Sequence, residues 1–373
     1  MNRILVIGCL PGINGISSCI CNLYKHLDRT QFEWEFLVSQ DDFDSGYGFD
    51  ALKELNAKIH VIDYKRTHYP RVARQHLKEL MMSIPNLCGV HLHDTGSLNV
   101  YPIYLADQMN LPIQFIQMHS SGDVQPRSDT LSNRALAARR RIISGNKVVR
   151  LACSTPAGIY GYGNLLFSLF PNATDFDHFS YNPIYRELVR SRLNIPADAA
   201  VVGFPGHFWD VKNPLFAVEV FKAFHALQPD SHFILLGDGP LRNDSHRICK
   251  DAGILSYTHF LGYRPEMELF LNAMDVILCT SYSEGLPNTL IEAQATGLPC
   301  LVSENVSREA SVTELVEQLS LESPPYIWAN KIAKMLQSRT SRRSYHVELK
   351  EAGYDIVDSA NSLISRFNKC LSV

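Results

Sequence analysis

Short apolar runs alternate with longer stretches of helical periodicity along most of the chain. Runs typical of buried strands lie in the first half at 3–8, 33–38, 58–62, 89–93, 113–118 and 149–153. Those of the second half lie at 201–205, 232–236, 258–261, 275–279 and 300–303. Amphipathic stretches between them predict helices, for example at 16–27, 71–82, 214–227 and 241–252. Alternating strands and helices imply parallel sheets joined by right-handed crossovers. The pattern therefore predicts an α/β protein with two doubly wound sheets.

The 373 residues are too many for one typical domain, so two domains are expected. The join is predicted near Tyr181–Tyr185, where a proline and a change of pattern suggest a hinge. The first domain is then 1–183 and the second 184–353. The amphipathic segment 354–373 is expected to pack back on the first domain. No further strand is expected from residue 314 onward.

Two glutamates, eight positions apart, lie in the segment that joins two expected strands. Glu284 falls in the loop at the carboxyl end of the first strand, and Glu292 about one turn inside the next helix. Ligands of open α/β sheets bind at the carboxyl ends of the strands. A helix N-terminus there can bind a diphosphate, and a carboxylate can accept hydrogen bonds from ribose hydroxyls. The pattern predicts a site for a nucleotide that carries a second polyhydroxyl group.

Other expected strand ends of the second half also carry polar residues or glycines. Lys212 precedes Asn213 and Pro214, which suit the N-cap and first position of a helix, so its ammonium is expected beside a bound phosphate. Gly237 begins a Gly-Asp-Gly-Pro loop that either approaches a ligand closely or is a plain turn. Arg264 follows another strand and could contact a base, although an ordinary surface role is favoured.

The first half offers weaker signals. The loop Gly12–Ser17 could bring backbone N–H groups towards a phosphate, but it lacks the dinucleotide fingerprint. His93, His119 and Asp123 follow strand ends at one edge of the first domain. A functional and a structural role are equally weighted for the two histidines. Asp175 and Asp177 have the D-x-D form of a metal site, yet they follow no strand, and we interpret them as a chance match. No metal and no cofactor are predicted.

Composition narrows the possible partners. The formal net charge of −3 argues against nucleic acid as the main partner. Nine scattered cysteines without a C-x-x-C pair indicate a reducing compartment. No apolar segment approaches membrane-spanning length, so the expected location is cytoplasmic. Basic stretches at 65–78 and 134–150 are either solvated faces or a peripheral contact with anionic lipid, with equal weight.

The residues from Gly206 to Ser303 resemble the donor domain of the retaining glycosyltransferases of family 4, which have the GT-B fold. The matching pieces are Lys212-Asn213, Gly237–Pro240, Phe260–Gly262, Ser281–Pro287 and Glu292–Pro299. The resemblance continues more weakly at Gly15, His93, His119, Ala152–Ser154, Asn182 and Tyr354-Asp355. It is strongest to bacterial enzymes of capsule and exopolysaccharide assembly. It implies two facing Rossmann-like domains with a cleft between them.

The resemblance also implies roles for single residues. Glu284 would hydrogen-bond the donor sugar, Glu292 the ribose hydroxyls, and Lys212 the diphosphate. His119 would lie near the anomeric carbon, and Gly15 would leave room for the diphosphate. The further donor-binding residues implied are His207, Gly237, Arg264, Gly285, Leu286, Pro287, Asn288 and Thr289. The lysine and the helix dipole would stabilise the leaving nucleoside diphosphate without a metal.

Three positions depart from the family pattern. His207 stands where the family usually has an arginine, Asn14 replaces the first glycine of a pair, and Tyr185 ends the altered hinge motif. The expected function is retaining transfer of a hexose or N-acetylhexosamine from a UDP-sugar to a saccharide acceptor, itself lipid-linked, in cell-surface polysaccharide synthesis. The alternatives are a nucleotide-sugar epimerase of similar architecture and a catalytically silent protein that binds sugar nucleotides.

Overall fold

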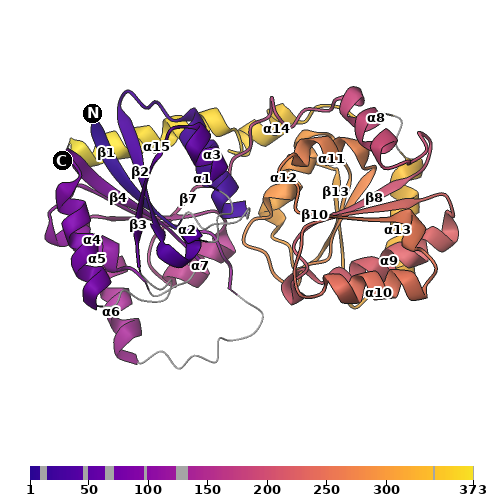
Figure 1. The fold of residues 1–373 in the computed structure, drawn as a ribbon, viewed down its shortest axis with the longest axis horizontal. Helices are drawn as coiled ribbons and strands as arrows, with labels where there is room; N and C mark the ends of the chain where they lie inside the picture. Colours follow the sequence, from indigo (N-terminus) through magenta and orange to yellow (C-terminus); the bar gives the residue numbers. More distant parts are fainter. Residues whose placement is uncertain are drawn as a thin grey trace. The chain divides into compact units, whose positions relative to one another are not determined.

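The computed structural model describes residues 1–8, 15–44, 49–63, 71–95, 99–122, 133–338 and 341–372. Contacts divide the chain into two units, Met1–Ala173 with Asp355–Val373 (unit 1) and Thr174–Tyr354 (unit 2). Each unit is a parallel sheet with helices packed on it (Figure 1). The predicted α/β class is confirmed. The predicted boundary between the two domains follows residue 183, whereas the contacts place it after residue 173. The difference arises because residues 174–182 pack within unit 2. There the backbone N–H of Asn182 donates to Asn272 Oδ1 at 2.7 Å.

The sheet of unit 1 has the order β3-β2-β1-β4-β5-β6-β7. Its strands are β1 (Asn2–Ile7), β2 (Phe32–Ser39), β3 (Lys58–Ile62), β4 (Leu87–Asp94), β5 (Ile113–Met118), β6 (Val148–Ala152) and β7 (Ser168–Leu169). Its helices are α1 (Gly15–His26), α2 (Gln40–Asp44), α3 (Asp50–Glu54), α4 (Arg71–Ser83), α5 (Tyr101–Gln108), α6 (Asn133–Ile143), α7 (Thr155–Tyr162) and α15 (Ile356–Leu371). All neighbouring strands pair in parallel.

The C-terminal helix α15 completes the core of unit 1 (Figure 1, yellow). Its Phe367 is fully buried, with ring centroids 5.2 Å from Phe32 and 5.0 Å from Phe115. The last residues of the chain therefore fold with the first 173.

The sheet of unit 2 has the order β10-β9-β8-β11-β12-β13. Its strands are β8 (Val201–Pro205), β9 (His232–Leu236), β10 (Thr258–Gly262), β11 (Val276–Cys279), β12 (Cys300–Ser303) and β13 (Val316–Leu319). Its helices are α8 (Pro183–Arg192), α9 (Pro214–Leu227), α10 (Arg242–Asp251), α11 (Met267–Ala273), α12 (Asn288–Ala295), α13 (Pro325–Gln337) and α14 (His346–Glu351). Short 3-10 turns occur at η1 (Asp210–Lys212), η2 (Leu255–Tyr257) and η3 (Arg308–Ala310).

The expectation of no strand after residue 314 is wrong. β13 pairs in parallel with β12 at the edge of the sheet. All four of its residues are only half-buried, and Glu317 and Gln318 are polar. An edge strand of this kind lacks the apolar run that marks the central strands.

The strand order reverses direction between β8 and β11. The chain runs outward from β8 to β10 and then returns to build β11 to β13 on the other side of β8. Loops that leave β8 and β11 therefore diverge, and open sheets bind ligands in the crevice formed at such a switch point. None of the helices in the described ranges is long and apolar enough to cross a membrane.

Candidate functional site

Lys212 and Glu284 form an ion pair at the switch point between β8 and β11. The Lys212 Nζ lies 2.6 Å from Glu284 Oε1 and 2.8 Å from Oε2. The side chains are 27% and 9% exposed, respectively, so the pair is largely shielded from water. The structure thus brings together two of the three predicted catalytic residues.

Hydrogen bonds fix the two loops to each other. Thr280 Oγ1 lies 3.1 Å from the Lys212 carbonyl and 3.0 Å from the Asn213 carbonyl, and it can donate to either. The backbone N–H of Tyr282 donates to the Val211 carbonyl at 2.8 Å. The loop after β11 therefore sets the position of the Lys212 backbone. Thr280 was missed by the sequence reasoning, because nothing marks its hydroxyl as facing a loop 67 residues away.

Asn213 occupies the predicted N-cap position of α9. Its backbone is left-handed, with φ 52° and ψ 52°, and its side chain makes no capping hydrogen bond. Pro214 occupies the first turn as predicted. The predicted N-cap position is confirmed, but the side-chain cap is not formed. The tight turn from η1 into α9 needs a residue that tolerates positive φ, and asparagine does so.

The immediate surroundings hold the Glu284 carboxylate in place. Ser281 Oγ donates to Glu284 Oε1 at 2.5 Å, and Cys279 Sγ lies 4.0 Å from the same oxygen. Burial and the Glu284 carboxylate raise the pKa of Cys279 to about 11, so it is a neutral thiol. Burial alone would lower the pKa of Lys212, but the Glu284 carboxylate outweighs burial and raises it. Lys212 is therefore an ammonium ion that faces a carboxylate.

Gly237 and Gly239 are explained by close backbone packing. Gly237 has φ 122°, and a Cβ there would lie 2.3 Å from the Gly206 carbonyl oxygen. A Cβ at Gly239 would lie 2.7 Å from the Phe208 carbonyl oxygen. The backbone N–H of Phe208 donates to the Asp238 carbonyl at 3.0 Å. Of the two roles considered for this loop, the turn role is supported by these contacts, and donor binding by Gly237 stays a prediction.

Glu292 is the fifth residue of α12, about one turn inside the helix. Burial raises its pKa to about 7, the carboxylate of Glu268 adds to the rise, and His178 opposes it. His178 Nε2 lies 3.2 Å from Glu268 Oε2. Glu292 is therefore only partly ionised near neutral pH, and it can gain stability from a ligand that donates hydrogen bonds to it.

His207 does not supply a second full charge near Lys212. Burial lowers its pKa, and the Lys212 ammonium lowers it further. The imidazole is therefore neutral in a neutral solution. Arg264 follows β10 at the same edge of the sheet and is exposed.

The segment from Gly285 to Thr289 joins the Glu284 loop to α12. Pro287 occupies the N-cap position, and the helix begins at Asn288. Leu286 is buried at 6% exposure, which anchors the loop in the interior of the protein. The positive end of the α12 dipole therefore lies four residues beyond Glu284 in sequence.

In unit 1, the two predicted histidines contact each other. His93 Nδ1 and His119 Nε2 are 2.9 Å apart, so one nitrogen donates to the other. Both rings are buried, and burial lowers the pKa of His119 to about 4 and that of His93 well below its usual value. His91 contacts His93 with ring centroids 4.2 Å apart and the ring planes tilted by 33°. Burial lowers the pKa of His91 as well, so the three rings are neutral imidazoles.

Two predictions for the first half lie outside the described residues, wholly or in part. Residues 9–14 of the first loop and Asp123 are not described, whereas Gly15 is the first residue of α1. Within the described ranges no group of three His, Cys, Asp or Glu side chains could hold a metal ion. Asp175 Oδ1 accepts from the backbone N–H of His178 at 3.3 Å, which is an ordinary turn contact.

Comparison with known proteins identifies the family. Residues 186–354 match the family model described as "Glycosyl transferases group 1". This match spans most of unit 2. It is 26% identical to EpsF of Bacillus subtilis, assigned by name to the glycosyltransferases, over 97% of this chain and 96% of EpsF. It is also 35% identical to an Escherichia coli enzyme over 36% of each chain. That enzyme is named "UDP-Gal:alpha-D-GlcNAc-diphosphoundecaprenol alpha-1,3-galactosyltransferase". The predicted family is confirmed.

Solved structures confirm the GT-B fold of this glycosyltransferase. The Anabaena protein HepE in complex with UDP-glucose matches with a TM-score of 0.78 and 14% identity, over 99% of this chain and 100% of HepE. WaaG, a glycosyltransferase of lipopolysaccharide biosynthesis, matches with a TM-score of 0.64 and 13% identity, over 96% and 94%. A Listeria monocytogenes protein assigned by name to the UDP-N-acetylglucosamine 2-epimerases matches with a TM-score of 0.66 and 12% identity, over 99% and 96%. The fold is therefore shared with the epimerase alternative, and the family match separates the two.

Proposed function

We propose that this glycosyltransferase transfers a hexose or N-acetylhexosamine from a UDP-sugar to a lipid-linked saccharide, with retention, during cell-surface polysaccharide synthesis. The Lys212–Glu284 pair carries the proposal, because it holds a cation and a sugar-binding carboxylate at the carboxyl ends of β8 and β11. The name of the E. coli relative includes a UDP-sugar and a lipid diphosphate acceptor. HepE structures that contain UDP-glucose add support for the nucleotide.

Donor binding exchanges the partners of both charged groups. The ammonium of Lys212 turns from Glu284 to the diphosphate, and the carboxylate of Glu284 accepts hydrogen bonds from sugar hydroxyls instead. The positive end of α12 faces the same diphosphate. Glu292, further along this helix, accepts the ribose hydroxyls. The remaining donor-binding residues of the proposal are Gly15, His207, Gly237, Arg264, Gly285, Leu286, Pro287, Asn288 and Thr289.

The chemical step places negative charge where Lys212 stands. The bond between the anomeric carbon and the UDP oxygen breaks, and its electron pair stays on the diphosphate. The acceptor hydroxyl attacks from the same face of the sugar, and its proton passes to a leaving phosphate oxygen. Lys212 stabilises the developing charge in a shielded site, where such contacts are strongest. His119, proposed to lie near the anomeric carbon, contributes a neutral imidazole.

Donor binding and turnover test the proposal directly. Purified protein is heated with a panel of UDP- and GDP-sugars, and a ligand that binds only the folded state raises the melting temperature. We expect a UDP-sugar to do so, and release of UDP to require an acceptor. The variant Lys212→Ala should lose the stabilisation. Lys222→Ala is the matched control, because Lys222 pairs with Glu219 on the exposed side of α9.

Three results would count against this function. UDP-sugar consumption without an acceptor would favour the epimerase alternative. Binding without turnover, over a wide acceptor panel, would favour the silent binding protein that His207 and Tyr185 motivate. Wild-type turnover in Lys212→Ala would remove the basis of the site itself.

We also propose that unit 1 contacts an anionic membrane surface, where a lipid-linked acceptor would be found. Arg140 and Arg141 are exposed on α6, and Leu166 after α7 is 87% exposed. Arg139 Nη1 donates to the Gly161 carbonyl at 2.9 Å, and Arg150 Nε to the Leu166 carbonyl at 2.7 Å. The first bond joins α6 to α7, and the second joins β6 to the exposed apolar residue Leu166. The other basic stretch, 65–78, lies partly outside the described residues.

Vesicle sedimentation tests the membrane contact. Vesicles with anionic lipid should bind the protein, and neutral vesicles should not. Leu166→Asp with Arg140→Glu should abolish binding. The control Leu227→Asp changes a side chain of unit 2 that is 55% exposed, and it should leave binding intact. Equal binding of all variants would contradict the proposed surface.

A further inference from the structure

A second cavity lies at the amino-terminal edge of the sheet of unit 2. Ala200, Asp275 and Pro299 of its lining come directly before β8, β11 and β12, whereas Lys212 and Glu284 follow the carboxyl ends of β8 and β11. A strand of four or five residues spans about 15 Å, so the sheet separates the two places. The cavity has a volume of about 420 Å³, within the range of small-molecule pockets. It is therefore a separate candidate site.

The wall of this cavity is preformed by a buried charge network. The Asp275 carboxylate accepts from Arg186 Nη2 and from Arg190 Nη2, each at 2.7 Å. It also accepts from the backbone N–H of Val201 at 2.8 Å. Arg190, whose side chain is only 4% exposed, also donates to the carbonyls of Ala273, Pro196, Ala197 and Ala199. The segment that lines one side is thus held in place before any ligand arrives.

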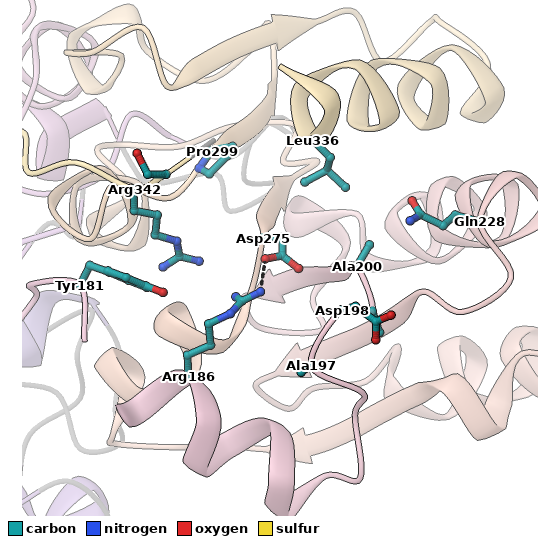
Figure 2. Close-up of a pocket in the computed structure, with 12 residues that line it drawn as sticks. Tyr181, Arg186, Ala197, Asp198, Ala200, Gln228, Asp275, Pro299, Leu336 and Arg342 are labelled. Carbon is teal, nitrogen blue, oxygen red and sulfur yellow. Dashed lines mark hydrogen bonds and ion pairs between the residues drawn. The ribbon is translucent and has the colours of Figure 1, made fainter. Parts of the chain in front are cut away.

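Beside this network, the end of the cavity at Arg342 presents planar cationic groups. The guanidinium of Arg342 lies over the ring of Tyr181, 4.9 Å from its centroid, and donates to the carbonyls of Leu271 and Met274. Figure 2 shows Arg342, Tyr181 and Arg186 on the same side of the cavity. The lining carries the guanidinium groups of Arg186 and Arg342 and the carboxylates of Asp275 and Asp198, and Arg190 behind the wall adds a third guanidinium bonded to Asp275. Because Asp198 lies at the far end, the end of the cavity at Arg342 and Arg186 has more positive than negative groups. Such a positive surplus on planar donors suits a phosphate or carboxylate group.

The opposite side is suited to hydroxyl groups. Asp198 and Gln228 line it and are exposed, and Figure 2 shows them across the cavity from Arg342. A carboxylate accepts hydrogen bonds from sugar hydroxyls, and an amide both accepts and donates them. The carboxylate of Asp198 would repel an anion on that side. Leu336 and Pro299 offer apolar surface for the C–H face of a sugar ring. The cavity is thus cationic at one end and hydroxyl-binding at the other.

We propose that this cavity binds a monosaccharide that carries one acidic group, either a sugar phosphate or a uronic acid. The acidic group lies at Arg342 and Arg186, and the hydroxyls lie at Asp198 and Gln228. A simple inorganic anion would use only the first half of the site, and a neutral sugar only the second. The ligand class follows from the need to satisfy both ends. This site would give the enzyme a contact with saccharides that is independent of the donor site.

Calorimetric titration with four probes tests the proposal: glucose 6-phosphate, glucuronate, glucose and inorganic phosphate. At least one of the two acidic sugars should bind. Glucose and phosphate should bind about tenfold more weakly, because the loss of one charge-assisted hydrogen bond lowers affinity by about that factor. The two acidic sugars distinguish a phosphate from a carboxylate ligand. Lys212→Ala, which alters the donor site, should leave this binding unchanged.

Variants at both ends of the cavity localise the binding. Arg342→Gln and Asp198→Ala should each weaken the acidic sugar about tenfold. Arg342 also contacts α11, so Asp198→Ala, at an exposed position, keeps the test valid if Arg342→Gln unfolds. Arg247→Gln is the matched control, because Arg247 is 69% exposed on α10 and pairs with Asp244.

Several outcomes would overturn the proposal. They are binding of neither acidic sugar, binding of phosphate as tight as that of glucose 6-phosphate, and wild-type affinity in Asp198→Ala. Loss of binding in Lys212→Ala would move the ligand to the donor site. A protein that binds UDP-glucose but neither acidic sugar would lose this proposal and keep the proposed transfer function.

Discussion

Removal of the Glu284 charge should strengthen the binding of UDP while it destroys sugar transfer. In the free protein the Glu284 carboxylate holds the Lys212 ammonium at 2.6 and 2.8 Å, so a diphosphate must compete for the lysine. Free UDP lacks the transferred sugar, whose hydroxyls could otherwise compensate Glu284 for the lost contact. The variant Glu284→Gln removes this competition and keeps the shape of the side chain.

The magnitude follows from the exposure of the pair. Exposed ion pairs contribute about 0.2–1 kcal/mol, and breaking a fully buried pair costs about 3–5 kcal/mol. With side chains 27% and 9% exposed, this pair lies between these limits. About 1–2 kcal/mol corresponds to UDP binding that is roughly 5–30-fold tighter in Glu284→Gln. Turnover of the UDP-sugar should fall by at least about 100-fold, because the sugar loses its carboxylate.

Calorimetry with UDP and a turnover assay measure the two effects on the same preparations. Glu219→Gln is the matched control, because Glu219 pairs with Lys222 on an exposed surface at 3.0 Å. It should change neither quantity. UDP affinity that is equal or weaker in a folded Glu284→Gln protein would refute the competition between carboxylate and diphosphate. Unchanged turnover would refute the role of Glu284 in sugar binding.

Three further predictions concern single residues. The folded-state pKa of Glu292 is raised from 4.5 to about 7, so the folded protein binds this proton more tightly than the unfolded chain. Its contribution to stability is therefore lost as the pH rises from 4.5 to about 7, and a melting-temperature profile of Glu292→Gln should lack this loss. Gly237→Ala should lower the free energy of unfolding by about 1–3 kcal/mol, because φ is 122° and the new Cβ meets the Gly206 carbonyl. The control Gly253→Ala, with positive φ but no atom within 4 Å of a Cβ, should cost about 1 kcal/mol in denaturant titration. Phe367→Ala should destabilise unit 1 by about 3–5 kcal/mol, whereas Leu371→Ala, at 38% exposure, should change its calorimetric transition little.

The central strands were predictable because parallel strands are covered on both faces. Such strands read as continuous apolar runs, as in β8 and β9, whose residues are nearly all buried. β13 and β7 lack this signal. β13 is half-buried at the edge, and β7 consists of two exposed residues, Ser168 and Leu169. Both strands are defined by hydrogen bonds to a neighbouring strand. A short polar or exposed sequence carries no pattern from which that pairing could be predicted.

The site was only partly predictable for a similar reason. Lys212 and Glu284 could each be placed at a strand end from the sequence. Their direct contact, across 72 residues, depends on the adjacency of β8 and β11. No local pattern specifies that adjacency. The contacts of Ser281 and Thr280 follow from the same adjacency, and both hydroxyls could be recognised as part of the site only after the two loops were placed together.

His207 stands near Lys212, where the family usually has an arginine. This difference changes how the site balances charge. In the free protein Lys212 neutralises Glu284, and the lysine together with burial keeps His207 uncharged. A bound diphosphate draws Lys212 away from Glu284 and adds negative charge next to the imidazole. Both changes favour protonation of His207, because an anion nearby raises the pKa of a histidine. A permanently charged arginine would attract the diphosphate before and after transfer alike. We therefore propose that His207 becomes a cation only while the diphosphate is present. In that case it contributes most when the leaving group carries its full charge, and loss of its proton favours release of UDP.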